Sequence, residues 1–599
     1  MSDQFRRFSD LGTQAFLRRY GTKQSVTIPK MVVEHHLNHL ESAGSQNDSP
    51  NEDKLDIMYD IDTSPPWYLS ILLGIQHYLT MFGSTVAIPF IICPAMCMES
   101  DDPAKGNIIS TILFVSGMVT LLQSSFGVRL PIIQGGTFAF IAPTIAILSL
   151  DKFKCPANFE RVGLGNMTYV EKTEEWQIRM REIQGAIIVS SLVQIFLGFS
   201  GIAGSFLRFV TPLTITPAIA MVGLGLLEPA SQFCAKHWGI SMGTVMLMIL
   251  LSQYLRNINI PCCKFLAIES LPIFKVFPVI MTILTMWSLC FVLTVTDVLE
   301  KGSYGRTDTK LKLLQDSTWF RVPYPFQWGL PTVHIGAVVG MIAGVIASAI
   351  ESVGDYFACA RLCGAPPPPT HAINRGIGVE GLGCMIAGIF GSGNGTTSYS
   401  ENIGAIGVTK VGSRRVIQFG ALVMIFFGLF PKFGSFFLTI PDPIVGGIFL
   451  TMFSIITGVG LSNLQYISLN STRNMLILGI SIFFPLMIQR WADNEDNQEK
   501  LETGFQFLDQ VILIILKTGM FVGGVLGLFL DNTIPGSPDE RGITKWNEHA
   551  KSGQDYSSST YDIPFITTYL RRLVYPFYNY FFSTNPYFCI PSCDNTNSA

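Results

Sequence analysis

The fold is decided by the stretch GNGTTSYSENIG, residues 393–404, which is short, polar and set between two long apolar runs. A second acidic stretch, ESVGD at residues 351–355, closes another apolar run earlier in the chain. A carboxylate at bilayer depth costs at least about 2.5–3.5 kcal/mol, so such a residue usually binds something. Two acidic sites beside glycine-interrupted helices predict a solute carrier without an open pore, with its site near the middle of the membrane.

The composition is that of a membrane protein. Hydrophobic residues make up 48% of the chain and charged residues 14%, whereas a soluble protein carries about a quarter charged residues. A net charge of -3 predicts no nucleic-acid partner. The 12 cysteines show no zinc-type spacing. Four of them are expected outside the membrane, where they could pair in ways that the sequence does not specify: Cys93, Cys97, Cys155 and Cys234.

We expect an all-α polytopic membrane protein with about fourteen transmembrane segments, at roughly 20 residues per span with shorter broken ones accepted. The third and tenth segments are too short or too interrupted for ordinary spanning helices, and they occupy corresponding places in two seven-segment halves. This pattern predicts two inverted repeats with discontinuous helices at the site. The expected segments are 68–92, 107–125, 133–150, 184–203, 209–228, 240–255, 276–296, 332–358, 372–391, 398–407, 414–438, 443–460, 473–489 and 507–530.

Polar tails flank this membrane domain. We expect a flexible tail at residues 1–66 without a cleavable signal peptide, the membrane transport domain at 67–531, and a second tail at 532–599. The aromatic patch at 575–588 is expected to lie on the membrane surface.

Basic residues in the short loops place both termini in the cytoplasm, because such residues gather on that side. The loop 151–183 then lies outside, and it contains the glycosylation sequon of Asn166. The orientation rests on Arg129, Arg208, Arg256, Lys264, Lys275, Arg361, Arg375, Lys410, Arg414, Arg415 and Arg473.

The two acidic stretches supply the candidate binding site. Glu351 and Asp355 are four residues apart, so they share one face of a helix and repel each other in a low dielectric. At least one of them needs a proton, a cation or a donor-rich ligand, which predicts ion coupling. Alternatively, each is a buried carboxylate satisfied by a neighbouring hydroxyl or backbone group. Glu401 opens the tenth segment, where it binds a ligand, caps the helix, or does both.

The third segment adds an aromatic ring and free backbone groups. It begins PIIQGGTFAF, residues 131–140, and Phe138 either stacks on a planar ligand or packs in the protein core. His77 on the first segment is interior and ionisable, with either a ligand or ion role or a structural one. Glu380 and His334 are further interior ionisable residues with a weaker case.

The chain resembles the nucleobase–ascorbate transporter family over roughly residues 55–550. Residues 401–410, ENIGAIGVTK, match the family signature throughout: Glu, Gln or Pro, then Asn, any residue, Gly, any four residues, Thr, and Arg, Lys or Gly. Two other family motifs are matched by QH at 76–77 and ESVGDY at 351–356. Similarity to the vertebrate sodium-coupled branch is carried by the stretches 252–257, 361–376 and 531–536.

Within the family, the chain looks like a nucleobase carrier of that branch. The ascorbate carriers have Pro in place of Glu401 and Ala-Ser-Ala near residues 135–137, whereas nucleobase carriers have Glu or Gln at the first signature position. Ascorbate is an anion, and a second carboxylate facing it is strongly unfavourable in a low dielectric. Nucleobases are neutral and offer N–H donors. A sodium-dependent ascorbate transporter is the nearest alternative.

The resemblance implies a role for each site residue. Glu351 and Glu401 would accept hydrogen bonds from ring N–H groups, Phe138 and Tyr399 would contribute stacking or backbone contacts, and Asp355 would serve a coupling sodium ion. No other cofactor is expected. The substrate set is Glu351, Glu401, Phe138, Gly136, Thr137, Tyr399 and Ser400, and the ion-coupling set is Asp355, His77, Gln134 and Asn402.

The family also implies elevator-type import at the plasma membrane, by a homodimer that couples sodium to uracil, thymine, guanine, hypoxanthine and xanthine. A core domain, 67–203 and 332–438, would slide against a gate domain, 204–331 and 439–531, in which prolines set rigid helix ends. The other classes are a channel, an intramembrane enzyme and a substrate-activated receptor. No nucleophile–base pair or metal-ligand cluster in the sequence supports an enzyme.

Overall fold

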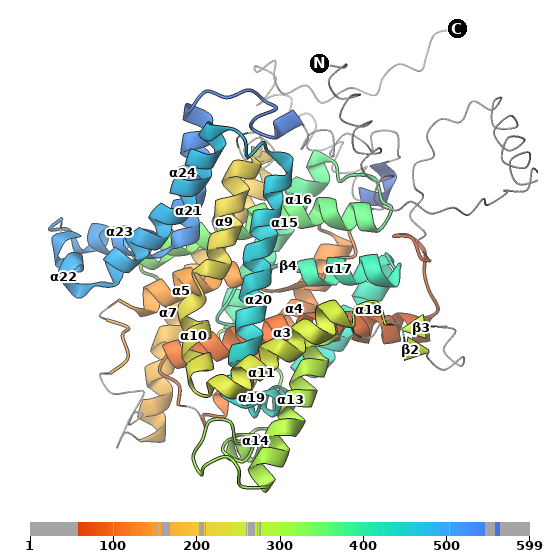
Figure 1. Cartoon of the computed structure of the whole chain (residues 1–599), viewed down its shortest axis with the longest axis vertical. Helices are drawn as coiled ribbons and strands as arrows, with labels where there is room; N and C mark the ends of the chain where they lie inside the picture. Colours follow the sequence, from red (N-terminus) through yellow and green to blue (C-terminus); the bar gives the residue numbers. More distant parts are fainter. Residues whose placement is uncertain are drawn as a thin grey trace, which may run out of the picture. The chain divides into compact units, whose positions relative to one another are not determined.

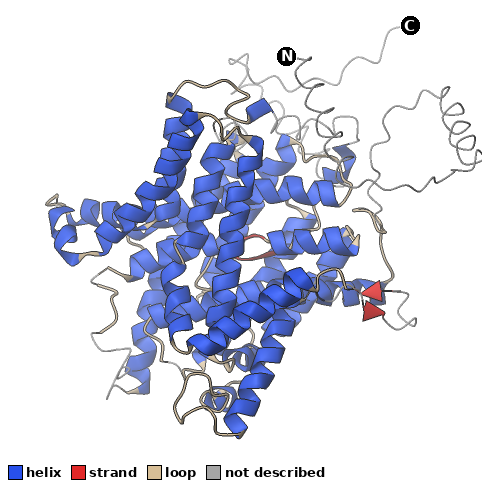
Figure 2. Cartoon of the chain, viewed as in Figure 1, coloured by secondary structure: helices blue, strands red, loops and turns tan. Residues whose placement is uncertain are grey.

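Helices make up most of the described chain, as the blue ribbons of Figure 2 show. The computed structural model describes residues 58–99, 101–150, 152–156, 168–202, 209, 211–258, 260–261, 270–271, 274, 277–501, 503–544 and 558–563. The predicted glycosylation site at Asn166, the aromatic patch at 575–588 and most of both predicted tails lie outside these residues.

One group of helices corresponds to the predicted segments one to four and eight to eleven. Within it, α7 packs against α16 and α15, and α18 packs against α4 and α3. The group consists of α3 (Trp67–Ala95), α4 (Ala104–Ser125), α5 (Ile141–Leu148), α7 (Tyr169–Phe199), α15 (Ile335–Leu362), α16 (Thr370–Phe390), α17 (Ser400–Thr409), α18 (Arg414–Gly428) and α19 (Pro431–Leu438).

The remaining helices include those of the other six predicted segments, together with the short α14 and α22, which lie between predicted segments. Here α20 and α24 pack against α9, and α10 and α11 pack against α20; α9 and α20 run side by side in Figure 1. The division into core and gate domains stays a prediction. These helices are α9 (Pro212–Leu224), α10 (Leu227–Ala235), α11 (Trp238–Ile249), α13 (Pro278–Val295), α14 (Leu311–Asp316), α20 (Asp442–Ser462), α21 (Thr472–Asp493), α22 (Glu495–Gln498), α23 (Gln506–Lys517) and α24 (Gly519–Thr533).

Spanning helices confirm a multi-pass membrane protein. In the described residues, 8 helices are long and apolar enough to cross a membrane, or up to 10 if each bent pair is one span. The bent pairs are α18 with α19, at 83°, and the α23 segment from Leu508 with α24, at 84°. All fourteen predicted segments overlap helices, but the number of crossings and the inverted repeat stay predictions.

Prolines begin the helices where the sequence predicts rigid ends. Pro212 lies in the first turn of α9, and Pro443 lies in the first turn of α20 behind the N-cap residue Pro441. Proline suits the first turn of a helix because the backbone N–H groups there have no intrahelical acceptor, so the N–H that proline lacks costs no hydrogen bond.

Glycines allow the closest helix contacts. A Cβ atom at Gly198 of α7 would lie 2.2 Å from the backbone nitrogen of Gly378 on α16. A Cβ atom at Gly74 of α3 would lie 2.6 Å from the backbone nitrogen of Gly420 on α18. Small residues bring helix backbones together in this way in membranes, where burial of apolar surface gives little drive for packing.

The expectation of an all-helical chain is corrected by two short strand pairs. Strand β1 (Gln134–Gly136) pairs antiparallel with β4 (Thr396–Ser398), and β2 (Ile260–Pro261) pairs with β3 (Ser270–Leu271). The first pair forms because the two broken segments leave backbone N–H and C=O groups without helical partners. Bonds between the segments satisfy these groups where water is absent.

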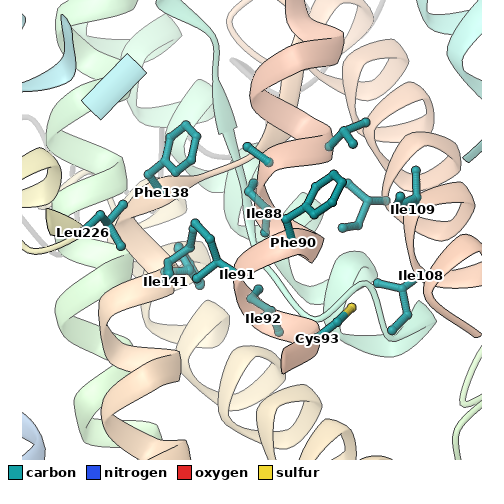
Figure 3. Close-up of a cluster of buried hydrophobic side chains, with 14 of the residues drawn as sticks. Ile88, Phe90, Ile91, Ile92, Cys93, Ile108, Ile109, Phe138, Ile141 and Leu226 are labelled. Atoms are coloured by element: carbon teal, nitrogen blue, oxygen red, sulfur yellow. The ribbon is translucent and has the colours of Figure 1, made fainter. Parts of the chain in front are cut away.

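A large apolar cluster surrounds the start of α5, and Figure 3 shows part of it. It joins α3, α4 and α5 to Leu226, which precedes α10. The labelled aliphatic side chains from the three helices are Ile88, Ile91, Ile92, Ile108, Ile109 and Ile141.

One disulfide connects two of the cysteines expected to be external. Cys97, just after α3, pairs with Cys155, beyond α5. Cys93 and Cys234 are buried free thiols.

Candidate functional site

The strand pair β1–β4 joins the two broken segments. Gln134 lies opposite Ser398, and Gly136 lies opposite Thr396. The 3-10 helix η1 (Phe138–Phe140) and α5 follow β1. In the other broken segment α17 follows β4, as Figure 1 shows. Because the strands are antiparallel, the two helical pieces start at opposite ends of the pair, and each start presents N–H groups that favour negative charge or acceptor atoms.

Glu401 lies in the first turn of α17 and is partly buried. Its Oε1 accepts a hydrogen bond from Ser84 Oγ of α3 at 3.0 Å. The carboxylate also interacts with its own backbone N–H. A role at the helix start is therefore compatible with ligand binding, as the sequence allowed.

Glu351 lies on α15, one turn before Asp355, and is also partly buried. Within the described part of the chain, no hydrogen bond to its carboxylate is found. Its charge is repelled by Asp355, Glu401 and Glu380. Glu351 thus lies beside other acidic groups and has no donor among the described residues, and a ligand that donates hydrogen bonds would relieve both conditions.

Asp355 has a different environment. Ser398 Oγ donates to its Oδ2 at 2.8 Å, and Ser400 Oγ donates to its Oδ1 at 2.7 Å. This geometry matches the alternative of a buried carboxylate satisfied by hydroxyls. Ser400, predicted to bind substrate, instead turns its hydroxyl toward Asp355. The two bonds fix the start of α17 against α15.

Tyr399 links the two broken segments. Its hydroxyl donates to the Gly136 carbonyl at 2.7 Å and lies 3.0 Å from Thr85 Oγ1 of α3. Its ring covers Gly135, where a Cβ atom would lie 2.0 Å from Tyr399 Cε2. Gly135 is therefore required by the close approach of the ring.

Phe138 and Thr137 line the same turn. The Phe138 ring meets Phe453 of α20 edge to face, with centroids 5.4 Å apart. Thr137 caps η1, since its Oγ1 accepts from the backbone N–H of Ala139 at 3.1 Å. Its carbonyl accepts from Asn394 Nδ2 at 2.9 Å. The Phe138 ring packs, as one alternative predicted, and a stacking role stays a prediction.

The residues predicted for ion coupling fall into two places. Asn402 Nδ2 donates to the His77 carbonyl at 2.8 Å and lies 3.3 Å from His77 Nδ1, which ties α17 to α3. Gln134 is fully buried, and both atoms of its side-chain amide lack a hydrogen-bond partner among the described residues. As cross-strand partners, Gln134 and Ser398 project from one face of the strand pair, toward the side of Asp355.

Glu380 on α16, for which the sequence made only a weak case, lies at the centre of a buried hydrogen-bond network. Its Oε1 accepts from Gln194 Nε2 at 3.0 Å and from Thr397 Oγ1 at 3.4 Å. Its Oε2 accepts from Ser352 Oγ at 2.6 Å and from the Tyr356 hydroxyl at 3.2 Å. An acidic residue inside the apolar segment 372–391 was the available signal. The sequence gives no signal for the residues that donate to Glu380, or for the bond from Ser84 to Glu401, because these contacts form only when distant segments pack together.

Comparison with known proteins identifies relatives along most of the chain. The model of the Permease family matches residues 69–493. Solute carrier family 23 member 2 of Rattus norvegicus is 49% identical over 545 residues, covering 89% of this chain and 83% of that protein. Solute carrier family 23 member 1 of Mus musculus is 46% identical, covering 90% and 91%. Nucleobase-ascorbate transporter 7 of Arabidopsis thaliana is 36% identical, covering 86% and 94%.

Solved structures show weaker likeness. SLC26A9 aligns with a TM-score of 0.47 and 10% identity, covering 86% of this chain and 72% of that chain. The transmembrane domain of the cyanobacterial bicarbonate transporter BicA aligns with a TM-score of 0.37 and 13% identity, covering 77% and 98%.

Proposed function

The chain belongs to the Permease family, in the vertebrate branch of the nucleobase–ascorbate transporters, and from this premise we propose that it imports nucleobases together with sodium. It is a multi-pass membrane transporter and not an enzyme. The observation that carries the proposed substrate is Glu351, a partly buried carboxylate without a described hydrogen-bond donor beside Glu401.

An uncharged heterocycle fits this pair of carboxylates. Uracil and oxopurines present ring N–H groups, which can donate to Glu351 and Glu401, and carbonyl groups, which can accept from N–H groups at the start of α17. Ascorbate would instead bring a further negative charge. Two unit charges 4 Å apart repel by about 4 kcal/mol at an effective dielectric constant of 20. The pair therefore favours the neutral ligand.

Sodium is proposed to bind near Asp355. Carboxylate, hydroxyl and amide oxygens suit a hard cation. Asp355, Ser398 and Gln134 supply one of each kind, and the Gln134 amide has no partner among the described residues. A cation there would offset the repulsion that Asp355 exerts on Glu351. This would leave Glu351 ionised and ready to accept from the base.

Elevator movement is proposed for the transport step. Support comes from the contact between the broken third segment and α20, where Phe138 and Phe453 meet through their rings. Apolar ring contacts lack the fixed geometry of ion pairs, so they are suited to surfaces that slide. The proposed homodimer and the plasma-membrane location follow from the family resemblance.

The test is uptake of labelled uracil, guanine and ascorbate by cells expressing the chain, in sodium medium and in choline medium at one pH. We expect saturable, sodium-dependent uptake of the bases that excess ascorbate does not inhibit. Equal uptake in choline would reject sodium coupling. Uptake of ascorbate without uptake of either base would reject the nucleobase assignment in favour of its nearest alternative.

A further inference from the structure

Helix α3 brings two neighbouring hydroxyls to the site. Ser84 Oγ donates to Glu401 Oε1 at 3.0 Å. The next residue, Thr85, places its Oγ1 3.0 Å from the hydroxyl of Tyr399. Both hydroxyls are fully buried, and they reach residues on either side of the start of α17.

The hydrogen bond of Ser84 goes to another helix, unlike that of most hydroxyls in apolar helices. Such hydroxyls commonly return to a carbonyl of their own helix, four residues earlier. Thr80 and Thr85 do so on α3, toward Gln76 O at 3.0 Å and Met81 O at 3.2 Å. Ser84 makes no such bond among the described residues, and its hydroxyl is committed to the carboxylate of Glu401.

The packing of α3 against α17 does not depend on this bond. The amide of Asn402 already donates to the His77 carbonyl at 2.8 Å, one residue further along α17. Removing the Ser84 hydroxyl therefore leaves a separate polar tie between the two helices. What it takes away is the contact that orients the Glu401 side chain.

We propose that Ser84 is a positioning residue for substrate binding, which holds Glu401 Oε1 so that the remaining acceptor positions of the carboxylate face the ligand. This inference rests on the proposed function, because it acts through Glu401 as the acceptor for a nucleobase. A hydroxyl that donates to a carboxylate makes a strong hydrogen bond. A carboxylate held in one orientation binds its ligand with less loss of freedom.

The variants that test this are Ser84→Ala, Ser84→Thr and Ser110→Ala. Ser110 is an equally buried control on α4. Among the described residues its hydroxyl bonds only to Asn107 O of the same helix, at 2.9 Å. The measurement is the initial rate of labelled uracil uptake, normalised to surface-exposed protein. We expect Ser84→Ala to raise the KM for uracil about tenfold and to change the maximal rate by less than about twofold. Ser84→Thr, which keeps the hydroxyl, should have the KM of the parent chain, and so should Ser110→Ala.

A second measurement separates positioning from a general structural effect. Binding of labelled uracil to purified protein is compared for Ser84→Ala in the parent chain and in a Glu401→Gln background. If Ser84 acts through Glu401, its substitution has little further effect once Glu401 is changed. Equal losses in both backgrounds, or an unchanged KM in Ser84→Ala, would overturn the positioning role alone. A parent chain that takes up no base would overturn it together with the proposed function.

Discussion

Two pairs of acidic residues lie in α15, α16 and α17, and they differ in what surrounds them. Glu351 and Glu401 are partly buried, and the one side-chain donor that reaches either of them in the described residues is Ser84. Asp355 and Glu380 are buried and have hydroxyl or amide donors on every carboxylate oxygen. The supply of internal donors among the described residues therefore separates the proposed substrate carboxylates, Glu351 and Glu401, from Asp355 and Glu380.

The two pairs are connected through β4. Ser398 Oγ donates to Asp355 Oδ2 at 2.8 Å and lies 2.9 Å from Ser352 Oγ, which donates to Glu380 Oε2 at 2.6 Å. The same strand leads directly into α17, which carries Glu401. A cation at Asp355 would thus act on the strand that positions the proposed substrate site, which gives a physical route for coupling.

The largest effect is expected from Glu380→Ala. The change leaves buried donors from Gln194, Ser352 and Tyr356 without their acceptor, and each such group costs about 1–3 kcal/mol. We expect little folded protein at the cell surface and a lower unfolding temperature in detergent. Glu380→Gln, which keeps an acceptor, should lose less. Normal folding of the alanine variant would contradict a scaffold role.

Glu351→Gln should have the opposite effect: uracil uptake should fall strongly, while the amount of folded protein at the cell surface should change little. A hydrogen bond to a charged acceptor contributes about 1.5–3 kcal/mol, so we expect uracil uptake to fall roughly 10–100-fold. Surface expression should match that of the parent chain, because no described bond is broken. If this variant failed to fold, as Glu380→Ala is expected to, the contrast between the two pairs would collapse.

The sequence predicts the parts of this contrast that are local. The spacing of Glu351 and Asp355 predicts their shared helix, and the glycine-rich stretch before Glu401 predicts a broken segment. It does not predict the β1–β4 pairing or the donor from Ser84, which lies 317 positions from Glu401. Such contacts depend on which distant segments pack together, and a single sequence does not show this.

Asp355→Asn sharpens the comparison at the proposed ion site. The amide lacks the negative charge that attracts a cation, but its oxygen can still accept from one of Ser398 and Ser400, and its NH2 group can donate to the hydroxyl of the other. We expect about a tenfold rise in the sodium concentration for half-maximal uptake, from the loss of one charge interaction of roughly 1.4 kcal/mol. Surface expression should change little. An unchanged sodium titration would assign Asp355 to the scaffold together with Glu380.

The smallest effect is expected from a methyl group on the strand pair. In Gly135→Ala, the new Cβ atom would lie 2.0 Å from the Tyr399 ring, so the ring must move and its bond to the Gly136 carbonyl must weaken. Gly354→Ala on α15 is the matched control, since nothing lies within 4 Å of the position that its Cβ atom would take. Uptake of uracil should fall about threefold to tenfold in the first variant, the loss of one hydrogen bond of about 1 kcal/mol with some strain, and should not fall in the second. Equal uptake by the two glycine variants would mean that the Tyr399 ring can move away from Gly135 without disturbing the site. The supply of hydrogen-bond donors would then account for the whole difference between the two pairs of acidic residues.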